Sequence, residues 1–123
     1  MKFTLDNPSA DYVFGNYGDG KLKVNQSDYD ASLIIFPDQL HTDWPVNSVD
    51  DLEVQHFDEI IARSPDIVLL GTGLQQQFLS VDLRRSLVQA QLNLEIMDTA
   101  AACRTYNLLV AEGRDVAAAV IIF

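Results

Sequence analysis

Short, continuous apolar runs separated by helix-like segments dominate the second half of this chain. The runs at 67–70, 93–97 and 116–122 are typical of strands buried within a sheet. Between them, apolar residues recur at helical spacing over 81–91 and 99–112. The alternation of strand, helix, strand, helix and strand predicts a β-α-β-α-β unit with largely parallel pairing and helices packed on the sheet.

The first half of the chain predicts shorter elements. Residues 12–14 and 21–24 are strand-like and flank a turn-rich segment at 15–20, which predicts a hairpin. The apolar run at 31–36 predicts a central strand, whereas a proline within 40–46 makes that segment an edge strand or an extended loop. These N-terminal strands either extend the main sheet or form a second, smaller layer.

Three further segments complete the pattern. The residues before Tyr12 predict an irregular lead-in, and 25–30 predict a polar turn. A capping pattern at Ser48 precedes a short helix at 58–63, which a proline then ends. The chain is therefore predicted to be a single α/β domain over residues 1–123, with a mixed sheet and packed helices.

The helix predicted at 81–91 begins after Ser80, whose hydroxyl is a suitable N-terminal cap. Helical spacing divides its side chains between an inward and an outward face. The inward set comprises Leu83, Leu87, Val88 and Gln91. The outward set comprises Asp82, Arg84, Arg85 and Gln89.

The helix predicted at 99–112 carries polar residues within an apolar sequence. Asp98 caps its start, and a glycine at 113 ends it. Arg104 and Asn107 share one face of this helix, and Glu112 lies on another. A helix this apolar is expected to be covered on more than one side, so these three polar residues would need partners. They either tie the helix to nearby loops or line a small cleft.

A glycine-rich turn follows the buried strand at 67–70. Ligands of α/β proteins bind beyond the carboxyl ends of such strands, and glycines let backbone N–H groups approach an anion. The dinucleotide pattern needs a glycine where Gln76 stands, and no Lys-Ser or Lys-Thr pair follows, so neither nucleotide motif is complete. The candidate ligand or partner site between this turn and the next helix comprises Gly71, Thr72, Gly73, Asp98, Thr99, Arg104 and Asn107.

Charge is distributed unevenly along the chain. The net charge is −10; residues 1–66 contain 13 acids and 4 bases, whereas 67–123 contain 5 acids and 4 bases. A chain this acidic repels nucleic acid and anionic lipid, so neither is an expected partner. No run is long enough to span a membrane and the N-terminus has no signal-like core, which predicts a cytoplasmic protein.

The residues with metal or redox chemistry are few. The single cysteine, Cys103, excludes an intramolecular disulfide, and its apolar helix face favours a buried core residue over a reactive thiol. His41, Asp43 and His56 match no metal-binding spacing. We therefore predict no metal ion and no cofactor.

Catalytic patterns are equally sparse. No plausible Ser–His–acid set exists. The carboxylates Glu95, Asp98 and Glu112 could in principle form an acid–base pair, but Asp98 is better explained as a helix cap and Glu112 can balance a neighbouring arginine. No catalytic residue is predicted, and a non-catalytic protein is favoured over an enzyme. Trp44 is either a lid on the core, which we favour, or an exposed anchor for a partner.

Three segments carry a resemblance to a known family: LGTG at 70–73, EIMDTAAACRTYN at 95–107 and EGR at 112–114. The chain resembles a widespread family of small Mth938-like domains of unknown function. Its relatives include the third assembly factor of the mitochondrial NADH:ubiquinone oxidoreductase and an adipogenesis-associated protein. The resemblance covers most of the chain and implies a single α/β domain with a mixed sheet and no agreed enzymatic activity.

Two functional hypotheses follow. The first is a non-catalytic interaction module, resembling an assembly factor or chaperone, with a protein partner. The alternative is a small-molecule or anion-binding protein, or an enzyme, with its site between the turn at 71–73 and the helix start at 98–107. The sequence leaves the oligomeric state open between a monomer and a weak dimer.

Overall fold

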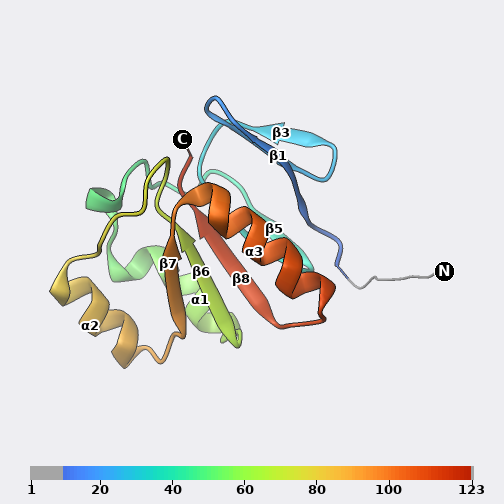
Figure 1. Cartoon of the computed structure of the whole chain (residues 1–123). Helices are drawn as coiled ribbons and strands as arrows, with labels where there is room; N and C mark the ends of the chain where they lie inside the picture. The colour runs from blue at the N-terminus through green and yellow to red at the C-terminus, as the bar shows by residue number, and fades with distance from the viewer. Residues whose placement is uncertain (1–9, 123) are drawn as a thin grey trace.

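A five-stranded mixed sheet forms the centre of the computed structural model, which describes residues 10–122 (Figure 1). Its strand order is β5-β4-β8-β6-β7. The bounds are β4 Leu33–Phe36, β5 Gln39–His41, β6 Ile67–Gly71, β7 Leu94–Met97 and β8 Val116–Val120. β6 pairs parallel with β7 and β8, whereas β4 pairs antiparallel with β5 and β8. The predicted mixed α/β fold and its parallel C-terminal unit are confirmed.

A small antiparallel sheet forms the second layer that the sequence left as one alternative. It contains β1 Phe14–Gly18, β2 Lys21–Val24 and β3 Ser27–Tyr29, in that order. The hairpin is confirmed, but its turn is tighter than predicted, because Gly18 pairs directly with Lys21 across Asp19 and Gly20. The expected lead-in at residues 1–9 lies outside the described residues.

The prediction of a polar turn over 25–30 is wrong. Only Asn25 and Gln26 turn the chain, and Asn25 adopts a left-handed φ of 55°. Ser27–Tyr29 then pairs with β2 as β3. Two of the three β3 side chains are exposed, so this strand has no apolar alternation that the sequence could display.

Three α-helices accompany the sheets within the described residues. They are α1 Asp58–Arg63, α2 Val81–Gln89 and α3 Thr99–Ala111, and two short 3₁₀ turns, η1 Val49–Asp51 and η2 Val54–Phe57, precede α1. α1 has the predicted bounds, and Ser80 and Asp98 cap α2 and α3 as predicted, each accepting a bond from a backbone N–H three residues on.

The orientation predicted for α2 is wrong in part. Leu87 is buried, but Val88 is 71% exposed and Gln91 lies beyond the end of the helix, also exposed. Figure 1 shows the reason: α2 lies beside β7, at one side of the sheet, instead of lying flat on a sheet face. A helix in this position buries a narrower stripe than a helix packed over a sheet.

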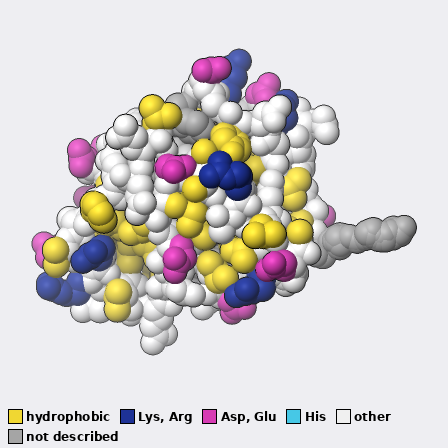
Figure 2. Space-filling view, in the orientation of Figure 1, with side chains coloured by type: hydrophobic (Ala, Val, Ile, Leu, Met, Phe, Trp, Pro, Cys, Tyr) yellow, Lys and Arg dark blue, Asp and Glu magenta, His cyan; other side chains and the backbone are white. Residues whose placement is uncertain are grey.

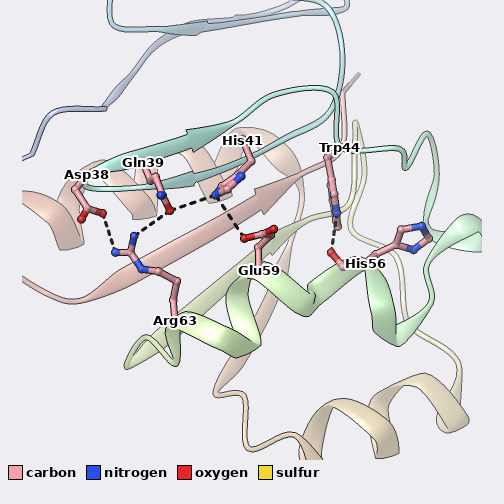
Figure 3. Close-up of polar contacts among 7 residues, drawn as sticks. All are labelled: Asp38, Gln39, His41, Trp44, His56, Glu59 and Arg63. Carbon is pink, nitrogen blue, oxygen red and sulfur yellow. Dashed lines mark hydrogen bonds and ion pairs between the residues drawn. The ribbon is translucent and has the colours of Figure 1, made fainter.

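Alternate residues of the central strands contribute to two separate cores, because successive side chains point to opposite faces. On one face, α3 and the small sheet pack on β4, β6 and β8, and Cys103 and Tyr106 are buried among them. On the other face, α1, the 3₁₀ turns and Leu87 cover the sheet. Trp44 belongs to this second core as a buried lid, and its indole Nε1 donates to the carbonyl of His56 (2.9 Å, Figure 3).

Candidate functional site

The end of β6 approaches the start of α3 unusually closely. A Cβ atom on Gly71 would lie 2.8 Å from Thr99 Oγ1 and 2.9 Å from Thr99 Cα. Real side chains do not tolerate these distances, so only glycine permits this packing. The structure therefore brings the predicted residues Gly71, Thr72 and Gly73 together with Asp98 and Thr99.

The Thr99 hydroxyl connects three segments at this point. It accepts a bond from Gly73 N (2.8 Å) and donates to the Ile121 carbonyl (2.7 Å), while Gly73 O accepts from Thr99 N (2.9 Å). One hydroxyl can make both bonds, because it has one donor and two acceptor positions. Thr99 is completely buried, so these bonds satisfy its hydroxyl and the two main-chain groups without solvent.

The Thr72 hydroxyl organises the loop that follows the turn. Its oxygen lies 2.7 Å from the Gln75 carbonyl and 3.2 Å from the Met97 carbonyl, and it accepts from Gln77 N (3.1 Å). Thr72 N also donates to Met97 O (2.9 Å). The turn and its neighbours thus use their polar groups to join β6, β7 and α3.

Arg104 and Asn107 are directed to a different part of the molecule. Asn107 Oδ1 accepts from Phe14 N (2.9 Å) and its Nδ2 donates to Phe14 O (2.8 Å), so the amide binds β1 as a neighbouring strand would. Arg104 Nη1 contacts the Tyr17 hydroxyl (2.9 Å) in the same strand. These contacts favour the interpretation that the two residues tie α3 to neighbouring structure.

In the part of the chain that the structure describes, the side chains that could react or bind a metal ion also show no sign of a chemical site. Cys103 is buried, and desolvation raises the pKa of its thiol to about 12, which keeps it protonated and unreactive at neutral pH. Within residues 10–122, no three His, Cys, Asp or Glu side chains are grouped to hold a metal ion. Across the same residues, no helix combines the length and the apolar character needed to cross a membrane.

A groove of about 580 Å³ between α2 and β7 was not predicted from the sequence. Its apolar lining comprises Val81, Leu87 and Val88 from α2, Leu92 from the connection, and Leu94 and Ile96 from β7. In Figure 2, hydrophobic side chains gather on the left of the view, with Lys and Arg side chains beside them. The exposed valines of α2 were the available signal, but helical spacing assigned Val88 to the core.

Apolar exposure continues into the loop before α2. Leu74 is 78% exposed and Phe78 is 81% exposed, and both precede the groove residue Val81, which is also exposed. Single exposed apolar side chains are common, but several along one connection and one helix indicate an interaction surface. We call Leu74, Phe78 and the groove residues together the α2–β7 surface.

Two arginines give this surface a positive rim in an acidic protein. Arg84 and Arg85 line the groove. Arg85 lies 3.7 Å from Asp82 in an exposed pair, and Arg84 has no ion-pair partner among residues 10–122. Exposed pairs of this kind are weak, so both guanidinium groups remain accessible to an anionic partner.

The main chain of β7 is open on the side away from β6. Val68 N donates to Asn93 O and Thr72 N donates to Met97 O, so alternate residues of this segment face β6. The N–H and C=O groups of Leu94 and Ile96 must then point to the outer edge, where the sheet order places no further strand. An apolar groove and an open strand edge therefore lie side by side.

Comparison with solved structures identifies the class of fold. A Mth938-like domain from Bordetella pertussis, solved by NMR, is similar to this chain with a TM-score of 0.79 and 29% identity, over 98% of this chain and 92% of that one. The fold is therefore that of the Mth938-like domains. The family described as "Protein of unknown function (DUF498/DUF598)" matches residues 14–121, and the chain belongs to this family.

Two relatives of this chain carry different names. The chain is 31% identical to the "13 kDa major membrane protein" of Francisella tularensis subsp. holarctica (strain LVS), over 98% of this chain and 99% of that protein. It is 29% identical to the "NADH dehydrogenase [ubiquinone] 1 alpha subcomplex assembly factor 3" of Xenopus tropicalis, over 95% of this chain. The match spans 65% of that assembly factor's length. The predicted resemblance to the family is confirmed.

Proposed function

We propose that this protein is a non-catalytic interaction module, similar to an assembly factor, that binds a protein partner through the α2–β7 surface. The groove between α2 and β7 carries the proposal. It is apolar, accessible and bordered by exposed side chains that contribute little to the core. Burying a large apolar side chain gains about 1.5–3 kcal/mol, so covering Phe78 and Val88 would provide substantial binding free energy.

The relatives support a role in protein association. Assembly factors in the same family are named for acting on a multi-subunit complex, which requires contacts with protein. Since the match covers only part of those proteins, their particular complex is not transferred to this chain. The cytoplasmic location predicted from the sequence remains part of this proposal.

The alternative hypothesis of an anion or small-molecule site at residues 71–73 stays a prediction. The polar groups there hold Thr99, Met97 and Ile121 through internal hydrogen bonds, and Asn107 holds β1. A ligand would have to compete with these bonds. This arrangement supports a structural role for the turn more strongly than a binding role.

Affinity capture with crosslinking from native lysate tests the proposal. The variant Val88→Glu places a charge on the α2–β7 surface, and Leu108→Glu is its matched control, because Leu108 is also an exposed apolar helix residue (60%) but lies on α3. We expect one stoichiometric partner that wild type and Leu108→Glu retain and Val88→Glu loses. A partner retained equally by all three proteins would place the interaction elsewhere.

A further inference from the structure

We infer that the partner enters as an extended acidic segment, which adds to the open edge of β7 as a sixth strand and places alternate apolar side chains in the groove. This inference rests on the proposed interaction function and specifies the kind of segment that binds. It follows from the main chain of β7, from the side chains that line the groove, and from the charge at its rim.

The main chain of β7 provides the template. Two N–H groups and two C=O groups, those of Leu94 and Ile96, point away from β6 along a strand of four residues. Strand addition satisfies such groups through regular main-chain hydrogen bonds, which give affinity without requiring one particular sequence. An incoming segment of similar length would pair with all four groups.

The groove determines which side chains of the added strand are apolar. Leu94 and Ile96 point to the same sheet face, where they border the groove, and α2 forms the opposite wall with Val81, Leu87 and Val88. Side chains alternate between faces along a strand, so every second residue of the added strand would enter this space. The volume of about 580 Å³ lies within the range that pockets use to enclose apolar groups.

The rim determines the charge of the segment. Arg84 and Arg85 lie on the wall opposite β7, and Arg84 has no ion-pair partner among the described residues. Guanidinium groups bind carboxylates through paired hydrogen bonds, so acidic residues beside the apolar positions would be favoured. An acidic segment would otherwise be repelled by a chain of net charge −10, which makes this rim a selective entry point.

A second copy of this chain is the weaker candidate for the same edge. Symmetric pairing of two β7 strands uses the same surface on both copies, so Arg84 and Arg85 of each would border one shared interface. It would also bring together two chains of net charge −10. Both effects oppose self-pairing and favour a separate acidic segment.

Selection of random linear peptides on the immobilised full chain provides the first test. We expect enriched peptides with apolar residues at every second position and acidic residues between them. In an added strand, every second backbone N–H faces β7. N-methylation of that set of alternate amides in an enriched peptide should abolish binding, whereas N-methylation of the other set should leave binding nearly unchanged. Peptides with helical spacing, peptides without acidic residues, or no enrichment would overturn the inference.

Amide hydrogen exchange places the peptide on the molecule. Binding should slow exchange at Leu94 and Ile96, while Glu95, whose N–H faces β6, should change much less. The double variant Arg84→Glu/Arg85→Glu should weaken peptide binding about tenfold or more. Arg114→Glu, which changes an exposed arginine outside the groove, is the control and should leave the affinity within about twofold.

Failure of this inference can be separated from failure of the proposed function. A partner lost from Val88→Glu, together with unchanged exchange at Leu94 and Ile96, would retain the interaction surface and reject strand addition. Absence of both a Val88-dependent partner and peptide binding would reject both proposals. A Val88-dependent dimer in sedimentation, with protected Leu94 and Ile96 amides, would identify a second copy as the occupant and overturn the acidic-segment assignment.

Discussion

The two edges of the five-stranded sheet differ in how their side chains are used. At β5, the edge strand has three residues, and polar side chains of this strand and of the turn before it connect to α1: Arg63 binds Gln39 (3.2 Å) and Asp38 (2.7 Å), as Figure 3 shows. Arg63 also lies 4.3 Å above the ring of Phe36. At β7, apolar side chains border a groove, which separates this strand from α2.

The difference shows how one sheet can resist pairing with other chains at one edge and leave its other edge open to such pairing. Short edge strands with charged or polar side chains resist pairing with other chains. His41 strengthens this character at β5 through contacts with Gln39 (3.3 Å) and Glu59 (4.0 Å). β7 has none of these contacts among its described residues and is continuous with apolar surface, and this is the side of the molecule for which we propose a protein partner.

The largest expected effect comes from removing the Thr99 hydroxyl, which joins the start of α3 to the segments that follow β6 and β8. Thr99→Val keeps the shape of the side chain but leaves Gly73 N and Ile121 O buried without their partner. Each unsatisfied buried group costs about 1–3 kcal/mol, so for two groups we expect a loss of about 2–6 kcal/mol in the free energy of unfolding, measured in urea. Thr99→Ser keeps the hydroxyl and should lose far less stability. Equal losses in the two variants would show that the hydroxyl does not hold these segments together.

The next effect tests how α2 is anchored as a wall of the groove. Leu87 is the buried residue of α2, so Leu87→Ala should cost about 2–4 kcal/mol through lost packing and a cavity. Val88→Ala, one position along the same helix, should stay within about 0.5 kcal/mol, because Val88 is exposed. Similar urea midpoints for the two variants would contradict the position of α2 beside the sheet.

A smaller effect compares arginines at the two edges. Arg63→Ala removes an exposed ion pair, a hydrogen bond and a cation–π contact, for an expected loss of about 1 kcal/mol in urea unfolding. Arg84→Ala should change stability by about 0.3 kcal/mol or less, since no described ion pair is lost. If Arg84→Ala were as destabilising as Arg63→Ala, the β7 edge would also be internally bridged.

The smallest effect depends on pH. The hydrogen bond from Arg63 holds the pKa of Asp38 below its ordinary value. Stability from this pair is therefore present above the unfolded-state pKa of about 3.9 and is lost as the pH falls through the lower folded-state pKa. The carboxylate is exposed, so the contribution should be well under about 1 kcal/mol.

An NMR titration of the Asp38 carboxyl resonance measures this shift directly. In Arg63→Ala, the pKa of Asp38 should return toward the ordinary range, because the bond that lowers it is absent. Arg84→Ala is the control and should leave the Asp38 titration unchanged. A low pKa that persists in Arg63→Ala would show that another group stabilises the carboxylate.

Local signals in the sequence predicted the elements that local physics determines. The cap at Asp98, the bounds of α1 and the buried runs of β6 and β8 depend on neighbouring residues, and the structure has each of them. The carboxyl ends of parallel strands lie at one edge, so the approach of residues 71–73 to the start of α3 was also predictable. Whether that approach has any binding role stays a prediction.

Features created by distant packing were not predictable in the same way. Asn107 binds Phe14 across 93 residues of sequence, and helix spacing alone identifies no such partner. Val88 was assigned to the core because a helical pattern counts apolar residues without knowing that α2 lies beside the sheet. The groove depends on that placement, so it became visible only in three dimensions.

The position of β8 has a consequence for synthesis on the ribosome. β8 pairs with both β4 and β6, yet it is the last strand of the described sequence to leave the ribosome. Until it emerges, the β4–β5 hairpin and the β6–β7 pair cannot join, and the apolar faces of both remain without their central neighbour. Closure of the five-stranded sheet therefore has to wait for β8 to follow all the other described strands, and until then the partly paired strands expose apolar faces that favour aggregation.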